Sequence, residues 1–291
     1  MSVSKVRETL ERIGAITPTN IVQIASRTRD REVPVFKDSQ TGVIFIDDYY
    51  VGDDEYQTGE YRGETSVPNF EDLSDTERRA NSFKQFYVGR RVLDFGCGAG
   101  NFLRTIHSVA SSAFGVELQR SFNEALNRDG IPCFSDVSQV PLPVETAFMF
   151  HVLEHLSDPL AVLAELRTTL EPQEGILVVE VPHANDFLIN QLKCEPFIDF
   201  TLWSQHLVLH TRESLQKLLG AAGFQNIQIK GVQRYGLANH LTWLSEGMPG
   251  GHKGRLSLLE SQALTQAYEA ALAAQDCTDT LVAIARVGSE P

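Results

Sequence analysis

The spacing of apolar residues changes about one third of the way along the chain. From residue 90 onward, short apolar runs alternate with segments whose apolar residues recur at helical spacing. Strands separated by helices of this length predict a mostly parallel sheet covered by helices on both faces. The expected strands are residues 91–95, 113–117, 132–136, 146–150, 175–181, 226–230 and 280–287. The sequence therefore predicts an α/β, Rossmann-like domain with a seven-stranded sheet.

The first part of the chain follows a different pattern. Residues 1–30 have helical spacing, and two short strands are expected at 33–36 and 41–46. An acidic, tyrosine-rich stretch follows at 47–63, before a predicted helix at 75–88. We expect an N-terminal α+β cap over residues 1–72 and the core over 73–291. Further helices are expected at 159–170, 211–222 and 256–275, and insertions at about 183–210 and 231–255.

Composition narrows the class of protein. The 291-residue chain carries a net charge of −13, whereas nucleic-acid binding needs a clustered basic surface. No apolar run is long enough to predict a membrane span, and the first ten residues lack the apolar core of a signal peptide. Four scattered cysteines form no CxxC pair and fit a reducing compartment. We therefore expect a cytoplasmic protein with no membrane span, and nucleic acid is disfavoured as its partner.

The strongest local signal is a glycine-rich turn between the first core strand and the next helix. It reads Val92-Leu-Asp94-Phe-Gly96-Cys-Gly98-Ala-Gly100-Asn-Phe102. Glycines at such a turn let the backbone approach a ligand closely. Asn101 stands where a GxGxxG dinucleotide motif would have its last glycine, which disfavours a nicotinamide dehydrogenase.

Three carboxylates at strand ends suggest the shape of the ligand. Asp94 suits a ligand with an ammonium group, and Glu117 can accept hydrogen bonds from ribose hydroxyls. Asp136 and Val137 can contact an adenine amino group and its face. A nucleoside with a cationic amino-acid tail satisfies all three positions.

The sequence here resembles the class I S-adenosylmethionine-dependent methyltransferases, closely over residues 90–182 and more weakly to 287. The resemblance includes the glycine turn, Gly115-Val-Glu117 and Phe150-His-Val-Leu-Glu154-His155-Leu-Ser-Asp158-Pro159. It implies that the last strand is antiparallel and that S-adenosylmethionine is the cofactor. Expected cofactor contacts are Asp94, Gly96, Cys97, Gly98, Gly100, Asn101, Phe102, Glu117, Leu118, Asp136, Val137 and His151.

Histidines gather after the predicted fourth strand and in the insertion that follows the fifth. One side of a helical turn would carry His151, Glu154 and His155. The segment with His206 is expected at the same edge of the sheet. We take His206, His155 and His151 as catalytic candidates, because a histidine tuned near neutrality can remove a hydroxyl proton. His155 could instead only pack and hydrogen-bond.

A divalent metal on Glu154, His155 and His206 is a further alternative. This layout is similar to that of small-RNA 2′-O-methyltransferases, whose helix carries two glutamates and a histidine. His151 stands where the first glutamate would be, and the chain is acidic. The metal and RNA readings are therefore disfavoured, and no metal ligand is predicted.

Two other segments carry side chains suited to an acceptor. The stretch 233–254 resembles regions of methyltransferases of surface-polysaccharide and sugar-nucleotide pathways, although a surface excursion or a homodimer contact would also explain it. Tyr56 and Tyr61 could close over the cofactor as a lid, or belong to an exposed acidic loop. Expected substrate residues are Tyr56, Tyr61, His183, Asn239 and His240.

The sequence thus predicts an S-adenosylmethionine-dependent methyltransferase acting on the hydroxyl of a carbohydrate or sugar nucleotide. Two alternatives stay open: a metal-dependent RNA 2′-O-methyltransferase-like enzyme and a catalytically silent binding subunit.

Overall fold

A seven-stranded sheet forms the centre of the protein. The computed structural model describes residues 4–59, 70–141 and 143–288. The strand order is β10-β11-β8-β7-β4-β5-β6, and β11 runs antiparallel to both of its neighbours, β8 and β10. The strands are β4 (Arg91–Phe95), β5 (Ser112–Val116), β6 (Cys133–Phe134), β7 (Thr146–Phe150), β8 (Ile176–Pro182), β10 (Phe224–Val232) and β11 (Thr280–Val287). The predicted seven-stranded sheet with an antiparallel last strand is confirmed.

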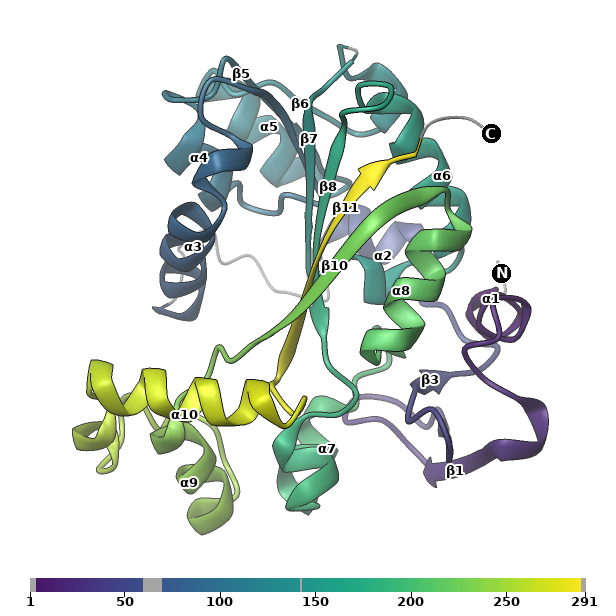
Figure 1. Ribbon diagram of the computed structural model, residues 1–291, viewed down its shortest axis with the longest axis vertical. Coiled ribbons are helices and arrows are strands. Elements are labelled where there is room, and N and C mark those ends of the chain that lie inside the picture. The colour runs from purple at the N-terminus through teal and green to yellow at the C-terminus, as the bar shows by residue number, and fades with distance from the viewer. Residues whose placement is uncertain (1–3, 60–69, 142, 289–291) are drawn as a thin grey trace.

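Helices cover both faces of this sheet, as Figure 1 shows. One face carries α3 (Phe70–Ser82), α4 (Asn101–Ile106) and α5 (Arg120–Arg128), and the other carries α6 (Pro159–Thr169) and α8 (Arg212–Ala221). Because both faces are covered, the central strands are apolar on both sides. One buried cluster joins Met149 to Leu163 and Leu215, and the other joins Phe148 to Phe83 and Phe102.

Capping side chains define where α6 and α8 begin. Asp158 accepts a hydrogen bond from the Ala161 backbone N–H at 3.2 Å, directly before Pro159 opens α6. Thr211 and Ser214 form a reciprocal capping box at the start of α8. The expected helices at 159–170 and 211–222 are therefore close to those observed.

A second sheet has four strands in the order β1-β2-β3-β9. Its strands are β1 (Ile21–Ala25), β2 (Val35–Asp38), β3 (Ile44–Ile46) and β9 (Val208–Leu209). The expectation of a helix over 1–30 was wrong, since α1 covers only Val6–Arg12 and is followed by Gly14 at φ +65°. Strand β9 comes from the insertion at 183–210, so the N-terminal region and this insertion share one sheet.

The N-terminal region is attached directly to the core. The Lys5 backbone N–H donates to the Ser157 carbonyl at 2.8 Å, and the Lys5 ammonium pairs with Asp158 at 2.7 Å. Helix α2 (Asp53–Thr58) follows the second sheet and reaches the edge of the core. These contacts bring residues 4–59 to the carboxyl ends of the core strands.

Two other helix boundaries differ from expectation. Helix α3 begins at Phe70 and ends at Ser82, because the chain tightens into a 3-10 turn at Lys84–Phe86 before Gly89. The expected helix at 256–275 begins only at Gln262, where Ser261 caps α10 (Gln262–Ala274). The insertions contain α7 (Glu195–Thr201) and α9 (Leu237–Glu246). Within the described parts of the chain, no helix has both the length and the apolar character to cross a bilayer.

Candidate active site

The glycine turn between β4 and α4 takes a backbone form that only glycine adopts readily. Gly96, Gly98 and Gly100 have φ values of +72°, +55° and +75°. A Cβ on Gly96 would lie 2.4 Å from the Val152 side chain, and one on Gly100 would lie 2.3 Å from Leu126. The turn is therefore packed tightly from both sides, and these glycines are required by geometry.

A cavity of about 390 Å³ lies beside this turn, at the carboxyl ends of the parallel strands. Ligands bind at this edge in open α/β sheets. Its walls come from the ends of β4 to β7 and from the segment around α2. They include Tyr50, Tyr56, Gly96, Glu117, Leu118, Asp136, Val137, His151, Val152 and His155. The cavity thus joins six of the predicted cofactor residues to the predicted substrate residue Tyr56 and the catalytic candidate His155.

Glu117 and Asp136 stand at the ends of neighbouring strands on one side of the cavity. The Glu117 carboxylate accepts hydrogen bonds from the backbone N–H groups of Gly98 and Gln119, both at 2.7 Å. Asp136 accepts hydrogen bonds from the Ser138 N–H at 2.8 Å and from its hydroxyl at 2.5 Å, which lower the pKa of Asp136. Both bonds to Asp136 end on one oxygen, so its second oxygen remains available to a ligand.

Asp94 lies beneath the glycine turn and is 3% exposed. No described residue donates a hydrogen bond to its carboxylate. Burial raises the pKa of Asp94 to about 7; Glu117 adds to the shift, while Arg79 opposes it. A buried carboxylate without a donor favours a cationic ligand, because a nearby positive charge stabilises its ionised form.

Asp94 makes folding pH-dependent in a defined direction. Its pKa is raised from 3.8 to about 7 in the folded protein, so the folded state keeps a proton that the unfolded chain loses. The contribution of Asp94 to the free energy of unfolding should therefore fall as the pH rises from 4 to 7. The isosteric Asp94→Asn variant lacks this loss. The unfolding free energy of the variant minus that of the parent should rise by as much as about 4 kcal/mol across that pH range and then level off.

Urea unfolding of both proteins at pH 4.5, 5.5, 6.5 and 7.5 measures this difference. An advantage that stays constant with pH would show that Asp94 titrates as an ordinary carboxylate.

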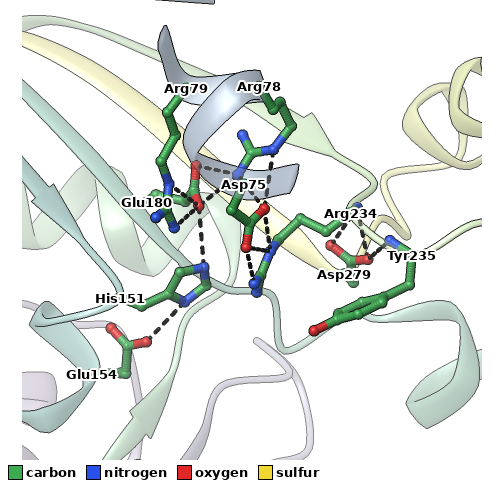
Figure 2. Close-up of polar contacts among 9 residues, drawn as sticks. All are labelled: Asp75, Arg78, Arg79, His151, Glu154, Glu180, Arg234, Tyr235 and Asp279. Carbon is green, nitrogen blue, oxygen red and sulfur yellow. Dashed lines mark hydrogen bonds and ion pairs between the residues drawn. The ribbon is translucent and has the colours of Figure 1, made fainter. Parts of the chain in front are cut away.

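His151 lies between two buried carboxylates, as Figure 2 shows. Its Nδ1 is 3.1 Å from Glu154 Oε1 and its Nε2 is 3.2 Å from Glu180 Oε1. Its φ of +54° aims the ring away from the direction that a regular helical turn would give. The expectation that His151, Glu154 and His155 share a helical turn was wrong, since only Leu153–His155 form a short 3-10 helix.

Glu180 connects His151 to α3. Its carboxylate is fully buried and forms ion pairs with two guanidinium groups. Glu180 Oε1 lies 2.8 Å from Arg78 Nη2 and 2.6 Å from Arg79 Nη2. Burial opposes ionisation, but Arg79, His151 and Arg78 outweigh it and hold the pKa of Glu180 well below its usual range. Glu180 is therefore an anion that ties α3 to the edge of the cavity.

The same ionic network continues to the last strands. Arg78 and Arg234 both donate to Asp75, each at 3.0 Å. Asp279 accepts the backbone N–H groups of Arg234 at 2.9 Å and Tyr235 at 3.1 Å (Figure 2). These contacts fix the position of α3 relative to β8 and β11.

A second group of polar side chains lies on the other side of Glu154. Ligand-type atoms of Glu154, His155 and His206 all lie within 4.8 Å of one another. His155 Nδ1 donates to the Gln205 carbonyl at 2.9 Å. The His155 and His206 ring centroids are 5.1 Å apart. The structure thus brings together two histidines that are far apart in the sequence.

Charges in this group are set by burial and by the neighbouring rings. Burial opposes ionisation of Glu154, but the hydrogen bond and charge of His151, aided by His155 and His206, lower its pKa to about 2. Burial lowers the pKa of His206 to about 3, and His155 adds to this effect. Glu154 is therefore an anion next to a neutral His206.

Several predicted residues lie away from the cavity. His183 and His240 are buried, and their Nδ1 atoms bond to the Thr278 carbonyl at 3.0 Å and the Tyr268 hydroxyl at 2.7 Å. Burial lowers the pKa of each to about 4. Asn239 lines a separate pocket beside α9, and Phe102 packs against Phe148 in the core. Tyr61 lies outside the described residues.

Sequence reasoning did not single out Glu180 or its two arginine partners as part of the site. A lone carboxylate within the otherwise apolar β8 was the available signal, because a buried charge requires a partner. The separation of 101 and 102 residues hid the pairing.

This sheet order, glycine turn and carboxylate pattern define a class I S-adenosylmethionine-dependent methyltransferase. A family model described as a methyltransferase domain matches residues 67–229, which is more than half of the chain. The chain belongs to this family.

The chain is also similar to individual proteins. An S-adenosylmethionine-dependent methyltransferase from Archaeoglobus fulgidus is 19% identical and superposes with a TM-score of 0.51 over 73% of this chain and 92% of that one. A magnesium protoporphyrin IX methyltransferase from Synechocystis, with S-adenosylhomocysteine bound, is 15% identical with a TM-score of 0.46, over 80% and 97% of the two chains. A protein encoded in a Streptomyces fradiae transposon is 28% identical over 149 residues. That match spans 44% of this chain and less than half, 43%, of the relative.

Proposed function

We propose that the protein transfers a methyl group from S-adenosylmethionine to a hydroxyl of a carbohydrate or sugar nucleotide. The observation that carries the proposal is the single cavity shared by the two expected halves of the site. Glu117 and Asp136 line one side of it, while Tyr56 and His155 line the other. Cofactor and acceptor would therefore meet in one enclosed space.

The cofactor half is supported by the shape and charge of the loop. Glu117 would accept hydrogen bonds from ribose hydroxyls, and Asp136 and Val137 would contact the adenine. Asp94 would favour the ammonium group. Gly96, Cys97, Gly98, Gly100 and Asn101 belong to the turn whose backbone lets the ligand approach. The sulfonium of the bound cofactor supplies an already activated methyl carbon.

The acceptor half combines aromatic and polar side chains. The rings of Tyr50 and Tyr56 stack with centroids 6.3 Å apart, beside the carboxylate of Asp53 and the amide of Gln57. Aromatic faces next to carboxylates and amides suit a sugar, which offers C–H faces and hydroxyls. In this proposal, residues 1–72 form a cap that encloses the acceptor and excludes water.

The reaction is an in-line displacement. The acceptor oxygen bonds to the methyl carbon as the carbon–sulfur bond breaks, and the hydroxyl gives up its proton. Alignment within the cavity is the main contribution of the chain and can supply about 7–11 kcal/mol in favourable cases. Loss of the hydroxyl proton would occur next to His155, which lines the acceptor half of the cavity.

Methyl transfer to a panel of sugar nucleotides, with radiolabelled S-adenosylmethionine, tests this proposal. We expect label in at least one carbohydrate, and a drop of about 100-fold or more for His155→Ala, in line with the loss of a group that acts on the reacting proton. His107→Ala, at an exposed histidine directly after α4, is the matched control and should retain full activity. Transfer to RNA alone, or cofactor binding without transfer to any acceptor, would contradict the carbohydrate proposal.

A further inference from the structure

Glu154, His155 and His206 place a buried carboxylate oxygen beside two imidazoles, and one of these imidazoles, that of His155, lines the cavity. We propose that these three side chains bind a divalent transition-metal ion of the Zn²⁺ or Mn²⁺ type. The ion would bind the acceptor oxygen, so its role, though not its presence, rests on the proposed methyl transfer.

The first support is an unsatisfied carboxylate. Glu154 is fully buried; its Oε1 contacts His151, but its Oε2 has no hydrogen-bond partner among the described residues. A buried polar oxygen without a partner is costly, and native proteins rarely retain one. A metal ion beside Glu154 would give this carboxylate oxygen a partner.

The second support is the set of contacts that the two imidazoles make. Metal ligation requires a ring nitrogen with a lone pair. No described residue forms a hydrogen bond with the His206 ring. His155 donates Nδ1–H to the Gln205 carbonyl, an arrangement that metal-binding histidines use to direct Nε2 at the ion.

The third support is the spacing. Two ligand atoms at about 2.1 Å from a tetrahedral ion stand about 3.4 Å apart. The three groups already lie within 4.8 Å of one another, so small side-chain rotations would complete the site. One carboxylate and two imidazoles suit Zn²⁺, Mn²⁺ or Fe²⁺ better than Mg²⁺, which prefers oxygen ligands.

The position explains what such an ion would do. Three protein ligands leave coordination positions open, as in catalytic rather than structural sites. His155 also lines the cavity, so an open position would face the acceptor. A metal-bound hydroxyl loses its proton more readily, and a water molecule would carry that proton away. The presence of His151 in place of a glutamate disfavoured a metal site in the sequence analysis. In the structure His151 is not one of the three proposed ligands and lies between Glu154 and Glu180.

The test uses the full chain without a histidine tag. The protein is stripped with EDTA, dialysed, and titrated with ZnCl₂, MnCl₂ and MgCl₂, with bound metal counted by mass spectrometry and binding followed by calorimetry. We expect one Zn²⁺ or Mn²⁺ per chain and weaker binding of Mg²⁺. Glu154→Gln and His206→Gln should each lower metal affinity at least about 100-fold, and His107→Gln should not.

S-adenosylhomocysteine binding, measured on every variant, identifies those that remain folded. Absence of a stoichiometric ion, or affinity unchanged in both Glu154→Gln and His206→Gln, would overturn the metal site. If the ion binds as expected but S-adenosylhomocysteine does not bind the parent protein, the metal site stands and the methyltransferase proposal fails.

Discussion

Replacing Glu117 by alanine should weaken S-adenosylhomocysteine binding at least about 100-fold. The variant would lose the carboxylate expected to accept two ribose hydroxyls, and each hydrogen bond to a charged group contributes about 1.5–3 kcal/mol. It would also release the Gly98 and Gln119 N–H groups, which the carboxylate holds at 2.7 Å. Isothermal titration calorimetry of parent and variant measures the change in dissociation constant.

Two further variants separate these effects. Glu117→Gln keeps an acceptor oxygen without the charge, so its affinity should fall between those of the parent and the alanine variant. Glu124→Ala removes an exposed carboxylate from α5, outside the cavity, and should bind like the parent. Equal affinity of Glu117→Ala and the parent would remove Glu117 from the cofactor site.

Replacing Glu180 by glutamine should give the largest loss of stability, on the order of 3 kcal/mol. The substitution keeps the shape of the side chain but leaves Arg78 and Arg79 without their shared carboxylate. Removing one partner of a buried ion pair is strongly destabilising, because the remaining charge is buried without compensation. Urea unfolding at pH 7 measures the difference in unfolding free energy.

The pH dependence of this loss has a definite sign. The pKa of Glu180 is lowered in the folded protein, so its contribution is present above about pH 4.5 and is lost as the pH falls further. The gap between parent and Glu180→Gln should therefore narrow in acid. Glu246→Gln, at an exposed pair with Arg255, should cost less than about 1 kcal/mol. A Glu180→Gln variant as stable as Glu246→Gln would show that the buried network contributes little.

Local patterns predicted the part of the site that lies within short stretches of chain. The glycine turn, Asp94 and Glu117 could be placed because each lies at or next to a strand end, and the alternation of strands and helices predicts a mostly parallel sheet. The capped starts of α6 and α8 were predictable for the same reason. Each of these features depends on neighbours within a few residues.

Long-range partners could not be predicted in this way. The pairing of β9 with β3, and of Glu180 with Arg79, joins segments more than a hundred residues apart. Periodicity indicates that a side chain is buried, but it does not identify the distant residue that forms its hydrogen bond or ion pair. His183 and His240 show this clearly: their polarity suggested a substrate site, whereas both are buried and hydrogen-bonded away from the cavity.

The most direct test of the central claim is a thermal-shift titration of the full chain with S-adenosylhomocysteine, with NADH in parallel. Binding at a hundred times the dissociation constant should stabilise the protein by about 2.7 kcal/mol. The structure predicts a concentration-dependent rise in melting temperature with S-adenosylhomocysteine and no change with NADH. A rise with NADH alone would contradict the methyltransferase assignment.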